Sequence, residues 1–472
     1  MWNSINQALN MIDNFVWGVP LMVLIIAGGL LLTIRLGLLQ IRKLPLALKW
    51  MLQNEEGGKG EISSFSALCT ALSATIGTGN IVGVATAVCA GGPGALFWMV
   101  VAAFLGMATK YSEGLLAVKY RTVAEDGHSL GGPFYYIELG MGKNFKWLAK
   151  IFAFFGVCVG LFGIGTFSQV NGISSAVHGF FDPNDAFTVK ILPFLGEYSW
   201  SVVIASLILS FCVAAVLIGG VKRIASVSQI IVPFMAVIYF VFAVILICCN
   251  ITKVPAAFAT IVTAAFSPKA ITGGAVGSML IAMQKGVARG IFSNEAGLGS
   301  APIAAAAAQT NSPVRQGLVS MTGTFIDTII ICTLTGLSIV LTGAWQVEGL
   351  EGVQVTTYAF QHGLPIPGQV SAFVLMICLV FFAFTTILGW DYYSERCLEY
   401  LTNGHKKTIL TYRWLYILAV FIGPYMTVSA VWTIADIFNG LMAIPNMIAL
   451  FALSGVIVKE TKTFFAAEKH KM

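Results

Sequence analysis

Charged side chains are scarce in this sequence. Asp, Glu, Lys and Arg make up only 10% of the 472 residues while hydrophobic residues make up 57%, whereas an ordinary soluble protein carries roughly 25% charged residues. The apolar excess extends along the whole chain and leaves no stretch for a water-soluble domain. The composition therefore excludes a soluble protein and predicts an all-α polytopic membrane protein.

Patterns of catalytic and metal-binding residues are also missing. The nine cysteines include no C-x-x-C pair and have no histidine beside them at ligand spacing, so we expect neither a disulfide framework nor a zinc site. The five histidines are scattered, and no Ser-His-Asp pattern or G-x-x-x-x-G-K-[ST] phosphate loop stands in a suitable context. The sequence thus predicts neither an enzyme nor an ATP-driven pump, so any coupled transport must use an ion gradient.

About eleven stretches are long and apolar enough to cross a bilayer, which takes about 20 residues. The N-terminus lacks the basic region and cleavage site of a secretory signal, so we expect the first stretch to be retained. The expected spans are 15–39, 65–89, 95–118, 147–177, 200–219, 224–249, 273–308, 318–345, 370–393, 410–426 and 431–458.

Lysine and arginine are concentrated in alternate loops. Because these residues accumulate on the cytoplasmic side, the asymmetry predicts an N-terminus outside and a cytoplasmic C-terminus. Only Lys190, Lys253 and Lys269 fall in outer loops, and the outer loops also carry acidic residues such as Glu348 and Glu351. The net charge of +6 follows from this topology, so nothing indicates nucleic-acid binding, and no feature predicts an obligatory protein partner.

Spans two and seven contain runs that oppose a continuous helix, at 75–80 and 286–299. Glycine is costly in a helix interior and asparagine competes for backbone hydrogen bonds, and a membrane tolerates the resulting break only around a cavity. The two spans are five apart, and an odd repeat must enter the membrane the opposite way the second time, which predicts inverted repeats. The expected parts are an extra N-terminal helix with a cytoplasmic amphipathic loop (1–62), two five-helix halves (63–250 and 270–458) and a basic tail (459–472).

Three stretches resemble the alanine or glycine:cation symporter family: GTGNIVGVA at 77–85, GGPGALFWM at 91–99 and ARGIFSNEAG at 288–297. The resemblance implies a sodium-coupled importer of a small neutral amino acid, alanine or glycine being favoured, in a bacterial or archaeal cytoplasmic membrane. It also implies the leucine-transporter type of fold, with two inverted five-helix repeats, discontinuous helices and one extra N-terminal helix. Proton coupling, a glutamine substrate and a channel remain as alternatives.

The breaks predict a site for both charges of an amino acid. Amides at 77–80 and the Asn80 side chain would hold the carboxylate, while carbonyls at 284–287 would hold the ammonium. The alternative is that the glycines only allow helices to pack closely. Gln169 could face the site or make an interhelical hydrogen bond, and Trp390 could be a pocket wall or an interfacial anchor. The expected substrate-binding residues are Thr75, Gly77, Thr78, Gly79, Asn80, Gln169, Gln284, Gly286, Val287, Ile291, Phe292 and Trp390.

A sodium ion would need oxygen ligands. The adjacent hydroxyls of Thr385 and Thr386, with the chain around Thr75 and Ile76, can supply them, and the resemblance supports this assignment. The alternative is that both threonines bond back to their own helix.

Three charged residues lie within span seven, where burial of a charge is expensive. We expect Lys285, Arg289 and Glu295 to be gate or scaffold charges, paired with one another or with Asp327, Asp391 or Asp436. They could instead carry protons.

Overall fold

The computed structural model describes residues 2–53, 55, 57–124, 127–190, 197–266, 275–426 and 428–469. The expected starts of span seven (273) and of the second half (270), as well as Lys269 and the end of the basic tail (470–472), lie outside the described residues.

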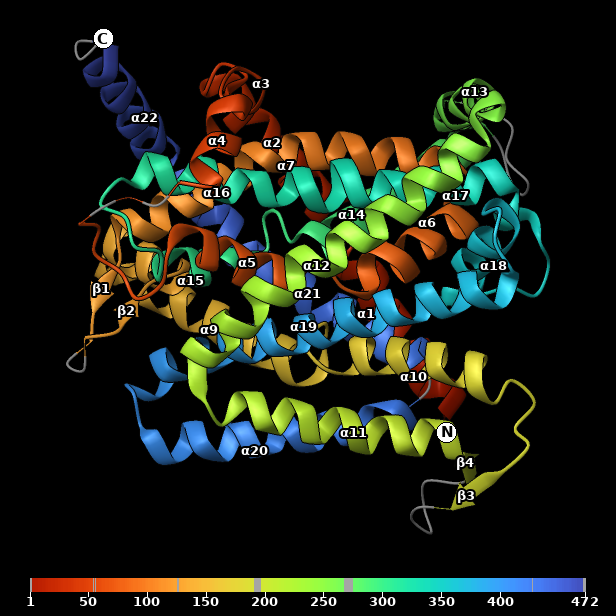
Figure 1. Cartoon of the computed structure of the whole chain (residues 1–472). Helices are drawn as coiled ribbons and strands as arrows, with labels where there is room; N and C mark the ends of the chain where they lie inside the picture. Colours follow the sequence, from red (N-terminus) through yellow and green to blue (C-terminus); the bar gives the residue numbers. More distant parts are fainter. Residues whose placement is uncertain are drawn as a thin grey trace.

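The described chain is a bundle of helices with two short hairpins (Figure 1). The α-helices are α1 (Trp2–Val16), α2 (Val19–Arg35), α3 (Leu39–Arg42), α4 (Leu44–Met51), α5 (Ser64–Thr75), α6 (Val84–Gly91), α7 (Gly94–Lys119), α8 (Pro133–Tyr135), α9 (Lys146–Phe162), α10 (Phe167–Phe181), α11 (Trp200–Leu217), α12 (Gly220–Cys249), α13 (Val254–Phe266), α14 (Ala275–Asn294), α15 (Ala301–Ala306), α16 (Pro313–Thr324), α17 (Thr333–Thr342), α18 (Val353–Gly363), α19 (Gly368–Thr402), α20 (Lys406–Ile422), α21 (Val428–Ala452) and α22 (Ser454–Lys469). The π- and 3-10 helices are η1 (Gly79–Gly83), η2 (Tyr136–Met141), η3 (Lys143–Phe145), η4 (Ile251–Lys253), η5 (Phe325–Cys332), η6 (Ala344–Gln346) and η7 (Gly423–Tyr425). The antiparallel pairs are β1 (Thr122–Val123) with β2 (Ser129–Leu130) and β3 (Thr188–Lys190) with β4 (Glu197–Ser199).

Eight helices in the described part are long and apolar enough to span a membrane, or nine when the bent pair Ser64–Thr75 and Gly79–Gly91 counts as one span. Helices also lie at the seventh and tenth expected spans. They are not among the eight, because α14 carries basic and polar residues and α20 has only 17 residues. The short apolar helix α13 lies where the sequence predicts an outer loop.

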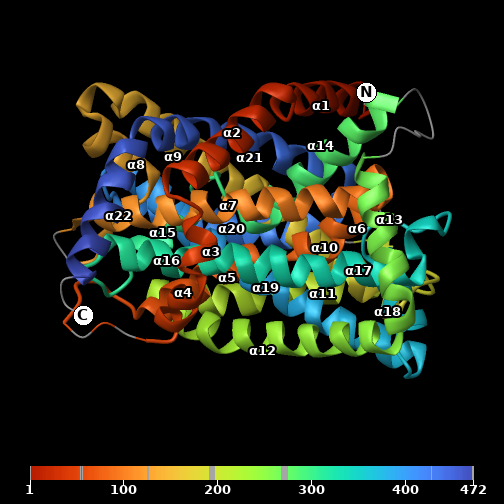
Figure 2. The ribbon, with the colours of Figure 1, turned by 90° about the horizontal axis from the view of Figure 1, so that it is seen from above.

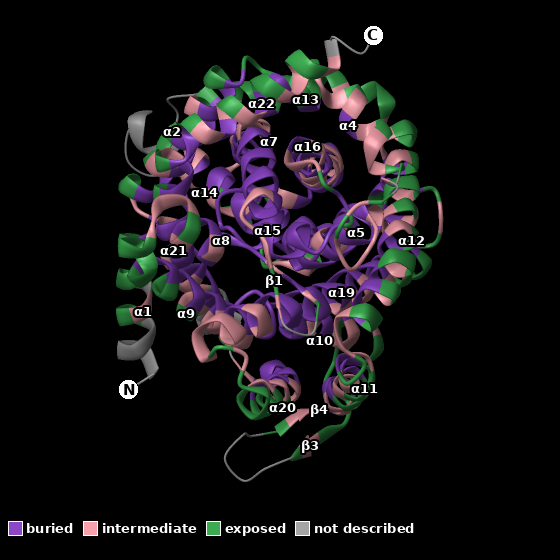
Figure 3. Cartoon of the chain, turned by 90° about the vertical axis from the view of Figure 1, so that its left-hand side faces the viewer, coloured by how far each residue is buried: buried purple, intermediate pink, exposed green. Residues whose placement is uncertain are grey.

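Burial divides the bundle into an inner and an outer layer. Helices α5, α7, α14, α15 and α19 form the buried centre, while α11, α12, α20 and α22 lie at the periphery with exposed faces (Figure 3). The peripheral faces are apolar, with Phe211 on α11 76% exposed and Ile230 on α12 70% exposed. Such faces suit contact with lipid, in which a helix has no reason to turn polar residues outward. Helices α1 and α22 lie toward opposite ends of the bundle (Figure 2).

The expected break in span two is present. Helix α5 ends at Thr75, η1 begins at Gly79, and the two halves are bent by 52°. This confirms that the Gly-Thr-Gly-Asn run interrupts the helix.

The break in span seven lies further along the chain than the sequence predicts. Helix α14 continues through Gly286 and Gly290 to Asn294, and the interruption covers 295–300 before α15. A Cβ at Gly286 would lie 2.2 Å from the Ala95 carbonyl oxygen on α7, so this glycine permits close helix packing. The chain leaves the helix where Glu295 takes a φ of +57°, a conformation that ends helices.

Span four is also interrupted, which the sequence did not predict. Helices α9 and α10 are separated at 163–166. A Cβ at Gly165 would lie 2.8 Å from Trp390 Cβ on α19, and the Tyr416 hydroxyl donates to the Gly165 carbonyl at 2.9 Å. A third span is therefore interrupted, and its backbone at the interruption contacts side chains of α19 and α20, which are distant in the chain.

Candidate functional site

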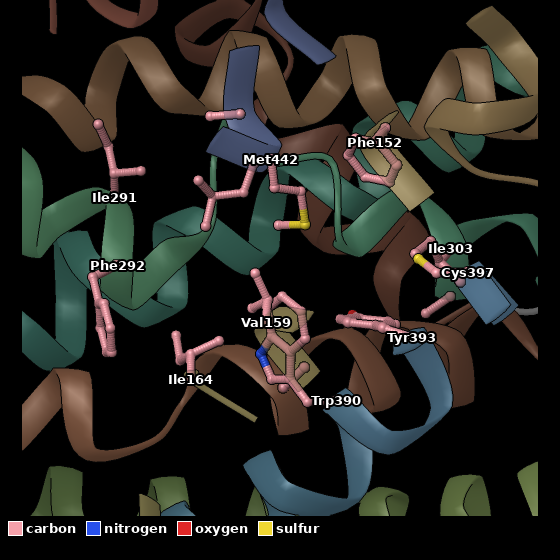
Figure 4. Packing of buried hydrophobic residues seen from close by; sticks show 14 of the residues in the cluster. Phe152, Val159, Ile164, Ile291, Phe292, Ile303, Trp390, Tyr393, Cys397 and Met442 are labelled. Atoms are coloured by element: carbon pink, nitrogen blue, oxygen red, sulfur yellow. The ribbon is translucent and has the colours of Figure 1, made fainter. Parts of the chain in front are cut away.

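The three interruptions meet in the buried centre. The Thr78 amide in the first break donates to Gln169 Oε1 on α10 at 3.0 Å. A Cβ at Gly79 would lie 3.3 Å from the Phe292 ring near the end of α14. Figure 4 shows Ile164, from the third interruption, between Phe292 and Trp390. The structure thus brings together both expected broken spans, α10 and α19.

Two of the amides expected to bind a carboxylate have partners within the protein. The Gly77 amide donates to Asn80 Oδ1 at 2.9 Å, and the Thr78 amide is held by Gln169. Asn80 Nδ2 donates to Asp327 Oδ1 at 2.7 Å, so the Asn80 side chain holds the break in shape and is not free for a substrate. Gln169 lies at the break and joins α10 to it by this hydrogen bond, as its interpretation as an interhelical hydrogen-bonding residue predicted.

Two polar side-chain atoms at this break have no hydrogen-bond partner among the described residues. They are Thr78 Oγ1 and Gln169 Nε2, both within side chains that are fully buried. A buried polar group without a partner is costly, and such a group in a native structure often marks the place of a ligand or water. The break therefore presents one hydroxyl and one amide nitrogen to a ligand.

The two adjacent threonines of α19 point in different directions. Thr386 Oγ1 lies 3.3 Å from the Ile76 carbonyl oxygen in the first break, and a Cβ at Gly77 would lie 2.5 Å from it. Thr385 Oγ1 lies on the other side, 3.6 Å from Met235 Sδ on α12. Both hydroxyls also donate to the Phe382 carbonyl of their own helix at 3.0 Å, as the alternative predicted. Thr75 Oγ1 donates back to carbonyls of α5. Of the four expected sodium ligands, the structure brings together only Ile76 and Thr386.

The stretch 284–287 does not form the carbonyl end of a half-helix. It lies inside the continuous helix α14, so this part of the predicted ammonium site is wrong. The Gln284 side chain points away toward the Trp17 carbonyl at 3.4 Å, and Val287 is buried in the hydrophobic core. Ile291 and Phe292 are fully buried near the real interruption.

The charged residues of span seven have separate environments. Arg289 forms a two-point ion pair with Asp436 on α21, one of its expected partners. Lys285 is exposed. Glu295 is fully buried and accepts hydrogen bonds from two neutral donors, Trp390 Nε1 at 2.7 Å and Ser300 Oγ at 2.5 Å, and the buried Lys110 ammonium on α7 also attracts its carboxylate. Trp390 is 1% exposed, which excludes its interpretation as an interfacial anchor.

Two buried carboxylates near the breaks were not predicted as site residues. Asp327 in η5 also accepts from Ser293 Oγ at 2.8 Å and so joins the first break to α14. Glu113 on α7 accepts from the Gly297 amide at 3.1 Å and from Asn446 Nδ2 at 2.7 Å. The sequence signal for both was an ionisable residue within an apolar span. Burying such a residue in a membrane costs free energy, so it usually has a structural or functional role.

A wide cavity approaches the breaks from one end of the bundle, although Thr78, Gln169 and Thr386 are not in its lining. This cavity of about 1110 Å³ is lined by residues of α6, α10 and α18 and reaches Val82 and Arg289. Beyond the breaks, a cavity of about 10 Å³ is lined by Thr75, Lys110 and Asn294, among others. The second cavity has room for about one water molecule at most. The wide cavity lies on the side of the expected outer loops, whereas the small one lies on the other side of the breaks, between α5 and α16.

Backbone pairing ties the closed end together. The Gln309 amide, after α15, donates to the Ile62 carbonyl, before α5, at 2.8 Å. The Arg121 guanidinium donates to four carbonyl oxygens of these two segments, including Ala308 at 2.8 Å and Lys59 at 2.7 Å. The end of α15 and the approach to α5 are therefore held as one unit.

Comparison with solved structures identifies the fold. The chain is similar to the crystal structure of MhsT in complex with L-phenylalanine, with a TM-score of 0.57, 12% sequence identity, and coverage of 86% of this chain and 99% of that chain. MhsT is a transporter with the leucine-transporter fold, so the predicted fold class is confirmed.

Comparison with known sequences identifies the family. An uncharacterized transporter of Haemophilus influenzae is 55% identical over 98% of this chain and 96% of its own length. The sodium/alanine symporter AgcS of Methanococcus maripaludis is 47% identical over 98% of both chains, and the probable sodium/glutamine symporter GlnT of Bacillus subtilis is 36% identical over 99% of this chain and 92% of its own. The family model for the sodium:alanine symporter family matches residues 2–472. This chain is a multi-pass membrane transport protein and belongs to the sodium:alanine symporter family.

Proposed function

We propose that this protein couples the inward movement of sodium to the import of a small neutral amino acid, alanine or glycine, across a bacterial or archaeal cytoplasmic membrane. The observation that carries the proposal is the meeting of Thr78, Gln169 and Thr386 at the first break, where two buried polar atoms lack partners. The name of the relative AgcS supports the choice of alanine and sodium.

The substrate binds at the first break, with its carboxylate on Thr78 Oγ1 and Gln169 Nε2. These groups are neutral donors, so they bind a carboxylate without a second buried charge in the empty site. Phe292 and Trp390, which Figure 4 shows on either side of Ile164, are the bulky side chains that restrict the substrate side chain in this proposal. This assignment replaces the predicted use of Asn80 and of carbonyls at 284–287.

The sodium ion binds beside the substrate, between the Ile76 carbonyl and the Thr386 hydroxyl. Both are oxygen ligands of the kind that a hard cation prefers, and they come from two different helices. A sodium ion there stabilises the bent form of the first break, which is also the form that binds substrate. The coupling is reciprocal, so substrate raises the affinity for sodium by the same factor.

Transport proceeds by alternating access between the inverted halves, 63–250 and 270–458, with the N-terminus outside and the basic tail 459–472 in the cytoplasm. The large cavity beside α10 and α18 is then the outer entry, and the closed end tied by Arg121 is the inner exit. The segment 1–62 supplies the extra helix.

The test is uptake of labelled alanine by proteoliposomes of the purified protein under an inward sodium gradient. We expect uptake to collapse when potassium replaces sodium and to survive a proton ionophore. Uptake that follows pH and ignores sodium would contradict sodium coupling, and uptake of glutamine but not alanine or glycine would contradict the substrate. Currents that never saturate with substrate would instead indicate a channel.

A further inference from the structure

Glu295 has both an unfavourable backbone conformation and a buried carboxylate. Among the described residues, four that are not glycine have a positive φ, and Glu295 is the one of these four whose side chain is fully buried. A left-handed conformation and a buried carboxylate each destabilise a fold, and they persist only where the surroundings enforce them. Such a combination at a helix break suggests a specific task for the side chain.

The Glu295 carboxylate connects three parts of the molecule. One oxygen accepts from the Trp390 indole on α19 at 2.7 Å, and the other accepts from Ser300 Oγ at 2.5 Å. Glu295 and Ser300 stand at the two ends of the 295–300 interruption. The carboxylate therefore closes this interruption on itself and anchors it to α19 through the indole.

The indole held by Glu295 lies near the meeting point of the breaks. In Figure 4 it lies next to Val159 and Ile164, with Phe292 on the other side of Ile164, and a Cβ at Gly165 would lie 2.8 Å from the Trp390 Cβ. Trp390 is one helical turn beyond Thr386, so both side chains lie on the same face of α19. Tyr393 packs edge-on against the indole from the far side, with ring centroids 5.5 Å apart.

We propose that Glu295 is a positioning residue that fixes the indole of Trp390 and thereby sets the largest substrate side chain that the site accepts. The indole has a single donor, and a charged acceptor binds it more strongly and at a better defined place than a neutral one. With the indole fixed, the space beside Phe292 suits a short side chain. When the hydrogen bond is absent, the ring is free to rotate and the space enlarges. The inference rests on the proposed function, since it takes the breaks to be the substrate site.

The experiment compares Glu295→Gln, Trp390→Phe and the double variant with the wild type in proteoliposomes. Trp390→Phe removes the indole donor and retains an aromatic ring. The measured quantities are the KM and maximal rate for alanine, and the inhibition constants of leucine and phenylalanine. Glu348→Gln, on an exposed loop, is the matched control.

We expect Trp390→Phe to lower the ratio of the leucine inhibition constant to the alanine KM by roughly 10-fold or more, as for a pocket that gains space for a few methylene groups. Glu295→Gln leaves a weaker, neutral acceptor for the indole and should lower the same ratio by a smaller factor. The maximal rate should change much less. The double variant should discriminate no worse than Trp390→Phe alone, because both changes act on the same hydrogen bond: Trp390→Phe removes its donor, and Glu295→Gln replaces its charged acceptor by a neutral one.

If Trp390→Phe leaves the ratio of the leucine inhibition constant to the alanine KM unchanged, the inference is overturned. This test remains possible even if Glu295→Gln does not fold. A collapse of the maximal rate without a change in discrimination would indicate a gate, and additive effects would indicate separate roles. If the wild type shows no sodium-dependent alanine uptake, the proposed function fails. If the wild type transports and the ratio is unchanged, only this inference fails.

Discussion

Arg289 on α14 and Asp436 on α21 face each other with two parallel hydrogen bonds, Nη1 to Oδ1 at 3.0 Å and Nη2 to Oδ2 at 2.7 Å. Their side chains are 15% and 12% exposed, and Arg289 lines the large cavity. The pair thus joins two helices at the wall of the access path, where water screens the charges only in part.

Removing one partner of this pair should destabilise the protein. We expect Arg289→Gln and Asp436→Asn each to cost about 2 kcal/mol, since a charge is left partly buried without its partner. The double variant should lose less free energy of unfolding than the two single variants together, because neither charge is then left without its partner. Thermal unfolding in detergent, followed by tryptophan fluorescence, measures the effect. A double variant that loses the full sum would show that the two residues act independently.

The two threonines of α19 should differ in their effect on sodium dependence. Thr386→Val removes an oxygen beside the Ile76 carbonyl, and we expect the half-saturating sodium concentration to rise roughly 10-fold, which corresponds to about 1.4 kcal/mol. Thr385→Val is the control of equal chemistry, because that hydroxyl lies beside Met235. Alanine uptake against sodium concentration distinguishes the two. Equal shifts in both variants would argue against a sodium ion at Thr386.

A methyl group at Gly77 should block the site. Its Cβ would lie 2.5 Å from Thr386 Oγ1 and 2.8 Å from Gln169 Oε1, and overpacking of this kind costs about 1–3 kcal/mol. We therefore expect Gly77→Ala to lose most alanine binding, measured by isothermal calorimetry. Gly83→Ala is the control, since its Cβ would have no neighbour closer than 4.0 Å. Normal alanine affinity in Gly77→Ala would place the substrate elsewhere.

Arg121 should control opening at the closed end. Replacing Arg121 by Gln removes most of the guanidinium hydrogen bonds to the segments before α5 and after α15 and leaves their backbone pairing in place. We expect faster hydrogen exchange of the backbone amides at 61–62 and 309–310, because local opening becomes less costly. Arg223→Gln, which loses only an exposed bond to the Ala215 carbonyl, should leave these amides unchanged. Unchanged exchange in Arg121→Gln would mean that backbone pairing alone keeps this end closed.

The sequence by itself determined the class of protein and the first break. A composition with few charges and long apolar runs permits only membrane-spanning helices, whatever the tertiary contacts. The run from Gly77 to Asn80 breaks its helix because two glycines and an asparagine side chain act locally, and Asn80 does bond to the Gly77 amide. The sequence also limited the partners of Arg289 to a few acids, since a charge in an apolar span needs one.

Only the tertiary structure decided the purpose of the other glycines and polar residues. Gly286 and Gly165 look alike in sequence, yet the first lets α14 pack against α7 and the second lies in a helix interruption against Trp390. The difference depends on helices remote in the chain, which no local pattern records. Thr385 and Thr386 are neighbours in sequence, but adjacent residues on a helix point about 100° apart. Which of the two faces the first break was therefore fixed by the rotation of α19 in the packed bundle.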